Sequence, residues 1–245
     1  MIYVLAVLLF ILFLTLRSPK IKGRIGEGSV RHKLRKLDRK EYKVLHDLMI
    51  QRTNGKTSQI DHMVISKYGV FVIETKNYRG WILGSEKSEY WTQVIYKRKE
   101  RLYNPIRQNY GHIKSLESYL GDSTIPFISI IAFSTRAELK LEQMSTDVVY
   151  TTGLVSAIQK YKHVVLSDEQ IYRIQKALAV KTIHTHQERR KHVSDIKRSL
   201  EEKAAFKSAG ICPRCKGELV ERQGKNGNFM GCSSFPKCRY TQKSQ

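Results

Sequence analysis

Short runs of β-branched and aromatic residues alternate along the chain with longer amphipathic stretches, a pattern that predicts strands interspersed with helices. The run at Pro126–Phe133 is apolar throughout, so we expect a strand buried on both faces. The other expected strands are Tyr42–Ile50, Ile60–Ser66, Val70–Lys76 and Val148–Tyr150, with Tyr78–Gly84 and Tyr90–Tyr96 extending the same sheet. The expected helices are Ser29–Leu37, after a flexible start at Gly23–Gly28, then Asn104–Leu120, Thr152–Tyr161 and Asp168–Val180. Strands bracketed by helices indicate an α/β fold, with a mixed β-sheet flanked by helices.

The two central strand patterns have the spacing of a β-hairpin. Ile60–Ser66 and Val70–Lys76 are separated by a short turn in which Gly69 can adopt the left-handed conformation. Folding about this turn would bring Asp61 close to Glu74 and Lys76. Two carboxylates and an ammonium group would then meet at the open end of an otherwise apolar hairpin.

This charged group can be explained in two ways. Carboxylates held close together repel and are costly to desolvate, and a divalent cation relieves both problems. Oxygen ligands suit Mg²⁺ or Mn²⁺, and Lys76 could then orient or help to deprotonate a water, or stabilise charge on a phosphate. The alternative is a salt bridge at a strand end. The strand register is also open, because a slip of one residue would place Asp61 on the opposite face.

Four short motifs occur in one order along this part of the chain. They are Gly26-Glu27, Gln59-Ile60-Asp61-His62, Glu74-Thr75-Lys76-Asn77 and Asn104-Pro105-Ile106-Arg107-Gln108. From about Lys22 to about Phe133 the chain resembles the nuclease-related domain, NERD, of the PD-(D/E)XK nuclease superfamily. The resemblance implies a restriction-endonuclease-like fold. It also implies that Glu27 supplies a further active-site acid, which could be a third metal ligand, and that Gln108 points into the active site. From the residues alone, Glu27 could equally be an acid near a helix start, and Gln108 a surface residue.

The charge balance narrows the class of partner. The chain of 245 residues has 44 Lys and Arg against 22 Asp and Glu, a net charge of +22. Such an excess favours a polyanion, which could be DNA, RNA or an anionic membrane surface. Residues 181–245 hold 15 basic and 6 acidic residues, so positive charge is densest in this last part of the chain.

All four cysteines lie close together near the end of the chain. Two residues separate Cys212 from Cys215, and five residues separate Cys232 from Cys238. Two close pairs of thiolates predict a tetrahedral Zn²⁺ site whose metal supplies much of the folding free energy, and a pair of disulfides is the alternative. The segment resembles the C4 zinc finger of bacterial type I topoisomerases, including Gly231-Cys232 and Arg239-Tyr240.

That second resemblance implies binding of single-stranded DNA, with aromatic side chains stacked on bases and basic side chains along the phosphates. The residues that could stack are Phe229, Phe235 and Tyr240, and those that could follow the backbone are Arg214, Lys216, Arg222, Lys225, Lys237 and Arg239. A purely structural or protein-binding ribbon stays open.

The first residues read as a membrane anchor. Ile2–Leu16 is almost wholly apolar, and the positive charges Arg17 and Lys20 lie on its C-terminal side. This predicts a single-pass helix in the cell membrane with the bulk of the chain facing the cytoplasm, and a buried core helix is the alternative. The expected domains are an anchor at 1–20, the α/β domain at 21–180, a charged, helical linker at 181–209 and a zinc ribbon at 210–245.

Taken together, these features predict a membrane-anchored nuclease that hydrolyses phosphodiester bonds in DNA with Mg²⁺ or Mn²⁺, while its zinc ribbon grips single strands. Its catalytic residues would be Asp61, Glu74, Lys76, Glu27 and Gln108, and the metal ligands Glu27, Asp61 and Glu74. The alternative is a catalytically inactive, nuclease-like protein that binds nucleic acid at the membrane. An RNA substrate stays open, because nothing in the sequence distinguishes ribose from deoxyribose.

Overall fold

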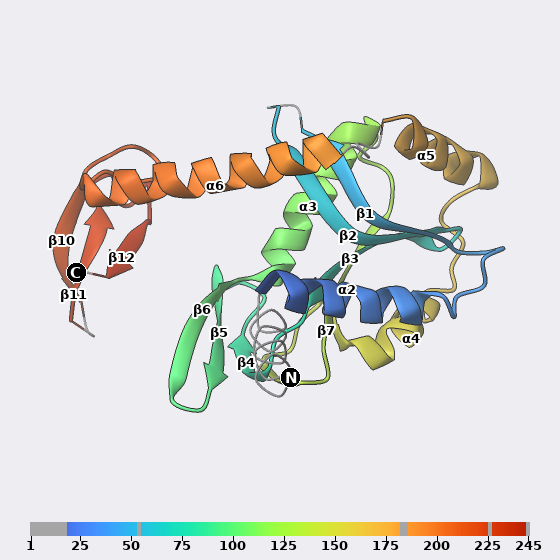
Figure 1. Cartoon of the computed structure of the whole chain (residues 1–245), viewed down its shortest axis with the longest axis horizontal. Coiled ribbons are helices and arrows are strands. Elements are labelled where there is room, and N and C mark those ends of the chain that lie inside the picture. The colour runs from blue at the N-terminus through green and yellow to red at the C-terminus, as the bar shows by residue number, and fades with distance from the viewer. Residues whose placement is uncertain (1–18, 53–54, 182–185, 225–226, 244–245) are drawn as a thin grey trace, which may run out of the picture. The chain divides into compact units, whose positions relative to one another are not determined.

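A computed structural model describes residues 19–52, 55–181, 186–224 and 227–243 (Figure 1). The chain folds as two units, Met1–Ile183 and His184–Gln245. The expected membrane anchor spans residues 1–20, and residues 1–18 lie outside the part of the chain that the structure describes. Within the described part, no helix is long and apolar enough to cross a bilayer.

The first unit is built on a five-stranded mixed sheet. Its strands β1 (Lys43–Gln51), β2 (Thr57–Ser66) and β3 (Gly69–Lys76) are antiparallel. Strands β7 (Phe127–Phe133) and β9 (Asp147–Tyr150) join in parallel, which gives the order β1-β2-β3-β7-β9. The expectation of a mixed sheet flanked by helices is confirmed. Register in the hairpin pairs Met63 with Val72 and His62 with Ile73, which places Asp61 and Glu74 at the same end.

Helices pack on both faces of this sheet because the central strands are apolar on both sides. One face is covered by α3 (Pro105–Leu120) and α5 (Asp168–Lys181). The other face is covered by α2 (Pro19–Leu34) and α4 (Leu154–Gln159). A short 3₁₀ turn, η1 (Thr151–Gly153), directly precedes α4. The first face packs Met63, Val72, Ile113, Leu116 and Ile174 together, and the second packs Val30, Leu34, Phe71, Ile73 and Ile158.

The strands that were expected to extend this sheet form a second sheet instead. Its order is β6-β5-β4-β8, with β4 (Gly80–Gly84), β5 (Tyr90–Ile95), β6 (Arg98–Tyr103) and β8 (Ala137–Leu141). Its core contains Ile82 and Trp91, and the Trp91 indole stacks on Phe133 with ring centres 6.1 Å apart. The extension of a single sheet was therefore wrong, because Gly80, at φ 75°, turns the chain out of β3 into a layer with its own core.

The first helix also differs from expectation, since α2 begins ten residues before Ser29 and runs through the glycines that were read as a flexible start. Gly26 is buried against the residue that follows β3, and a Cβ there would lie 2.7 Å from Asn77 Cβ. Gly26 thus allows the helix to approach the sheet closely. Glu27 lies inside the helix as a consequence, not at its first turn.

The second unit holds α6 (His186–Ser208) and a three-stranded antiparallel ribbon. Strands β10 (Leu219–Gly224), β11 (Gly227–Cys232) and β12 (Thr241–Lys243) pair in that order. The buried residues of the ribbon are Leu219 and three of its cysteines, Cys212, Cys232 and Cys238. An apolar core this small implies that the fold needs the cysteines to be bridged.

Candidate functional site

The polar residues at the open end of the β2–β3 hairpin contact one another. Strand pairing stops at His62 and Ile73, and the Thr75 backbone N–H then donates to Asp61 Oδ2 at 2.9 Å. The Lys76 ammonium forms an ion pair with Glu74 Oε1 at 2.6 Å. The hairpin therefore places both expected carboxylates and the expected lysine at one end of the sheet.

Helix α3 adds two side chains to this end. Its start is fixed by Asn104, whose side chain accepts from the Ile106 N–H at 2.9 Å, and by a proline in the first turn, where no N–H is needed. One turn later, Gln108 Oε1 accepts from Lys76 Nζ at 2.9 Å. Gln108 therefore lies at this end of the sheet and orients the lysine by this hydrogen bond.

His112 was not among the expected site residues, yet it lies within the site. Its Nε2 is 3.3 Å from Glu74 Oε2, an ion-pair distance without hydrogen-bond alignment, and its Nδ1 is 2.8 Å from Ser58 Oγ. The i,i+4 spacing from Gln108 was the signal, because it places both side chains on one face of the helix.

Burial makes the charge balance of the site unusual. Burial alone would raise the pKa of Glu74, but Lys76 and His112 outweigh it and hold that pKa below its ordinary value. Burial alone would likewise lower the pKa of Lys76, but Glu74, Tyr78 and Asp61 raise it overall. Lys76 is therefore a stable cation near neutral pH.

Asp61 behaves in the opposite way. Burial and the neighbouring Glu74 carboxylate raise its pKa to about 8, against the lowering effect of the Thr75 N–H. One lysine thus compensates Glu74 but leaves the charge on Asp61 without full compensation. A proton or a cation at Asp61 would relieve this excess.

Two further carboxylates lie near these residues. Burial and Asp47 raise the pKa of Glu27 more than Arg24 and Arg31 lower it, which places Glu27 and Asp47 within electrostatic reach of each other. Asp47 adopts the left-handed conformation, with φ 57°, and accepts from Gln59 Nε2 at 2.7 Å. Sequence reasoning missed Asp47, although pairing of β1 with β2 would have placed it opposite Asp61.

The donor set of Glu27, Asp61 and Glu74 suits a hard divalent cation, and the excess charge at Asp61 provides the reason to bind one. Their oxygens do not form a preassembled cluster. Among the described residues, one set of three or more Cys, His, Asp or Glu side chains has all its ligand atoms within 4.8 Å of one another, and that set is the four cysteines. Binding would therefore draw Glu74 away from its present partners, Lys76 and His112.

The four cysteines converge as their spacing predicts. The Sγ atoms of Cys212 and Cys238 are 3.8 Å apart, those of Cys215 and Cys232 are 3.2 Å apart, and all four cysteines are free. The Gly217 backbone N–H and the neighbouring thiols lower the pKa of Cys215 to about 6, which favours the thiolate that binds metal. The residues therefore fit zinc, and the disulfide alternative is wrong.

Five of the residues expected to bind DNA line one cavity of ≈ 170 Å³ on the ribbon. They are Arg222, Phe229, Phe235, Arg239 and Tyr240. Arg214 and Lys237 are exposed, Lys216 lies 3.1 Å from the centre of the Phe206 ring, and Lys225 lies outside the described residues. The cavity combines aromatic faces with guanidinium groups, as stacking on unpaired bases requires.

Comparisons with known proteins agree with this division into two units. Residues 22–134 match the family model of the nuclease-related domain. An uncharacterized protein of Bacillus anthracis is 42% identical over 178 residues, which cover 71% of this chain and 84% of that protein. The chain belongs to the nuclease-related domain family. No solved structure matches it.

The ribbon has a separate set of relatives. Residues 209–245 match the model of the topoisomerase DNA-binding C4 zinc finger. DNA topoisomerase 1 of Mycoplasmoides gallisepticum is 38% identical over 53 residues, 22% of this chain and 7% of that enzyme. DNA topoisomerase 1 of Methanocaldococcus jannaschii is 65% identical over 32 residues, 13% of this chain and 4% of that enzyme. Both expected resemblances, NERD and the C4 zinc finger, are confirmed, and the ribbon supports DNA binding.

Proposed function

We propose that this NERD protein is a nuclease that hydrolyses phosphodiester bonds in DNA with a divalent metal ion. One observation carries the proposal: a buried acid and lysine, Glu74 and Lys76, lie beside Asp61, whose carboxyl, once ionised, would carry a charge that the lysine does not balance. A structural salt bridge would need only one acid for one lysine. A further acid at such a site costs stability unless it binds a cation.

Asp61 and Glu74, with Glu27, would hold Mg²⁺ or Mn²⁺. When bound, the ion would polarise the scissile phosphate and lower the pKa of a water ligand. Lys76 keeps its proton because Glu74 raises its pKa, so its role is to orient the attacking water by donating hydrogen bonds and to stabilise charge on the phosphate. Gln108 fixes the direction of the Lys76 ammonium.

The zinc ribbon would hold a single strand and so raise the effective concentration of DNA at the NERD site. The support is the cavity that joins Phe229 and Phe235 to the guanidinium of Arg222. We further propose that the apolar run Ile2–Leu16 tethers the protein to the cell membrane on its cytoplasmic side. Extraction of membranes with alkaline carbonate tests the tether, and release of the full chain into the soluble fraction would refute it.

The catalytic proposal is tested with the purified full chain and labelled single- and double-stranded DNA and RNA, with and without Mn²⁺. We expect metal-dependent cleavage of DNA that falls by at least about 100-fold in Asp61→Asn and Lys76→Gln. Lys67→Gln is the matched control, because Lys67 lies at the turn of the same hairpin in an exposed ion pair with Glu41. Equal rates in the wild type, the two site variants and the control would refute the proposal, and preferential cleavage of RNA would change its substrate.

A second candidate function is DNA binding without turnover. The observation that favours it is that Lys76 and His112 already engage both oxygens of Glu74. It predicts salt-dependent DNA binding by the wild type and no cleavage with either metal. The same assay therefore separates the two functions.

A further inference from the structure

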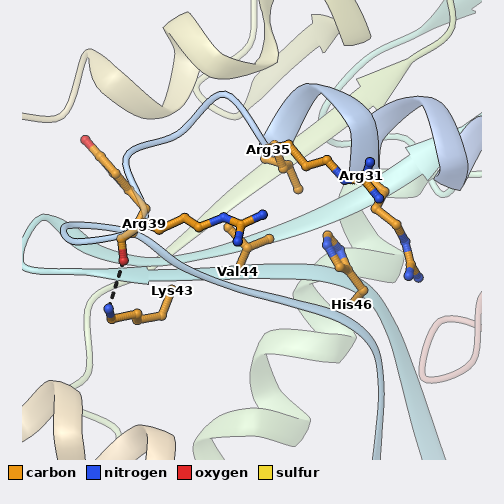
Figure 2. Close-up of a pocket in the computed structure, with 8 residues that line it drawn as sticks. Arg31, Arg35, Arg39, Lys43, Val44 and His46 are labelled. Atoms are coloured by element: carbon orange, nitrogen blue, oxygen red, sulfur yellow. Dashed lines mark hydrogen bonds between the residues drawn. The ribbon is translucent and has the colours of Figure 1, made fainter.

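A pocket of ≈ 490 Å³ with strongly basic walls lies on the NERD domain between α2 and β1 (Figure 2). Its basic residues are Arg31, Arg35, Arg39, Lys43 and His46, and its remaining lining residues are Leu34, Tyr42 and Val44. None of the described residues that line it is acidic. Arg31 lies in the last turn of α2 and His46 in β1, so the two elements form opposite walls.

The cations of this pocket are not neutralised within the protein. In the described part of the chain, Arg31, Arg35, Arg39 and Lys43 take part in no ion pair. The one hydrogen bond drawn in the pocket runs from Lys43 Nζ to the Arg39 carbonyl at 2.8 Å, which holds the ammonium against the pocket wall (Figure 2). Four like charges around one hollow repel one another, so an anion there would stabilise the arrangement.

Both walls of the pocket lead along the chain to acidic residues of the site. On α2, Arg31 follows Glu27 by four residues and therefore shares its face, and Arg31 lowers the pKa of Glu27. On β1, His46 directly precedes Asp47. Four helical residues span about 6 Å, and successive phosphates of one strand are about 3.4 Å apart along a DNA axis, so a strand lying along α2 would place a phosphate at the pocket about two nucleotides from the acids.

We propose that this pocket binds a backbone phosphate of the nucleic-acid strand about two nucleotides from the phosphodiester that lies at the Asp61–Glu74 site. The inference rests on the proposed function and adds a substrate-binding subsite to it. Nucleic acid is favoured over an anionic lipid because Arg31 lies one helical turn from Glu27 and His46 lies beside Asp47, at a site proposed to meet a phosphodiester, whereas a lipid headgroup would leave those acids without a partner.

The first test compares two double variants of the full chain that lose the same charge. Arg35→Gln with Arg39→Gln removes two cations of the pocket, while Lys36→Gln with Lys40→Gln removes two exposed lysines of the same segment that do not line it. Binding of labelled single-stranded DNA is measured by fluorescence anisotropy over a range of salt, without added Mg²⁺ or Mn²⁺. At about 0.7 ions released per phosphate contact, loss of this one contact should lower the salt slope of the arginine variant by about 0.7 and weaken binding about threefold at about 0.2 M salt, and the lysine variant should do neither.

The second test locates the phosphate. Probes carry one uncharged methylphosphonate linkage at successive positions, and each is measured with the wild type and the arginine variant. The wild type should lose affinity about threefold at one or two adjacent linkages, and the arginine variant should lose none there, because its pocket no longer reads that phosphate. A loss in the wild type that is the same at every linkage would overturn the proposal.

Two further outcomes would also overturn it. One is equal DNA affinity of the two double variants. The other is loss of binding to phosphatidylcholine vesicles containing phosphatidylglycerol in the arginine variant alone, with DNA binding unchanged, which would identify a lipid site. Because binding is measured without cleavage, wild type that binds through the pocket but cleaves nothing would refute the nuclease and leave the phosphate subsite standing.

Discussion

Asp61→Asn should abolish cleavage and yet stabilise the metal-free NERD domain. Burial and Glu74 raise the Asp61 pKa from 3.8 to about 8, so the ionised carboxylate opposes folding in the absence of a cation. Asparagine keeps an oxygen that can accept from the Thr75 N–H, now 2.9 Å from Asp61 Oδ2, and removes the charge. The variant thus separates the electrostatic cost of the site from its hydrogen bonding.

The magnitude follows from the size of the pKa shift. Each unit corresponds to about 1.4 kcal/mol, so the shift from 3.8 to about 8 gives an upper limit of about 6 kcal/mol. Asp61 keeps part of its surface in water, which screens the repulsion, and we expect the variant to gain about 2 kcal/mol at pH 8. Because the folded pKa is raised, the stability that protonated Asp61 contributes is complete below pH 3.8 and is lost as the pH rises through about 8. The advantage of the variant should therefore shrink as the pH falls from 8 to 5.

Urea unfolding followed by tryptophan fluorescence provides the measurement. Trp81 and Trp91 are the two tryptophans of the chain and both lie in the second sheet of the NERD domain, so the signal reports that domain alone. Burial lowers the pKa of His62 to about 3, which destabilises the fold below about pH 6.5, but it does so equally in both proteins and cancels in the comparison. Mn²⁺ at pH 8 should stabilise the wild type more than the variant.

Glu74→Gln is the matched comparison, and its stability should change in the opposite direction. It leaves the buried Lys76 ammonium without its carboxylate partner, now 2.6 Å away, which should cost about 3 kcal/mol or more. Equal destabilisation by Asp61→Asn and Glu74→Gln at pH 8, or a stability advantage of Asp61→Asn over the metal-free wild type that does not shrink from pH 8 to pH 5, would refute the reasoning.

Three other predictions follow from single contacts. His112→Gln should reduce Mn²⁺-dependent cleavage by about 10- to 100-fold with the urea midpoint little changed, because His112 holds Glu74 from the side opposite Lys76; an unchanged cleavage rate would contradict it. In urea unfolding, Gly26→Ala should destabilise the NERD domain by about 1–3 kcal/mol, because the added Cβ would collide with Asn77. Gly28→Ala is the control and should stabilise the domain by about 0.5–1 kcal/mol, because a Cβ added there meets no atom within 4 Å. Removal of zinc with a chelator should unfold the ribbon without changing tryptophan emission, and amide exchange in residues 210–243 that stayed slow would argue against a zinc-dependent fold.

The sequence predicted the central hairpin because its signal is local. A turn glycine, two apolar runs and the charges after them fix which ends meet, and the observed pairing of Met63 with Val72 brings Asp61 and Glu74 together as the turn requires. The cysteine spacing was equally informative, since four ligands leave little freedom in how they converge. The catalytic and DNA-binding roles of these residues remain predictions.

The second sheet and the start of α2 could not be predicted in the same way. The alternation of apolar and polar residues along β5 shows that one face of the strand is buried, but it does not show which sheet the strand joins. That choice depends on the packing of Trp91 against Phe133, which lies on a strand distant in the sequence. Gly26 lowers helix propensity locally, and the gain that outweighs it is close packing against Asn77, a contact 51 positions away that no local pattern reveals.

The conformation of Asp47 explains why the acidic site is hard to predict from the alternation of apolar and polar residues along the strands. Leu45 pairs with Met63, and Leu48 pairs with Ile60. All four side chains pack on the same face of the sheet, although Leu45 and Leu48 are three positions apart on β1, and Ile60 and Met63 are three apart on β2. Residues three apart on regular strands face opposite sides, so both strands change face between these pairs. The change coincides with the left-handed conformation of Asp47, a conformation that costs a non-glycine residue about 1 kcal/mol or more. The register places Asp47 opposite Asp61, between the pairs His46–His62 and Leu48–Ile60, and so a carboxylate stands in the irregular stretch where regular strands would have continued their apolar alternation.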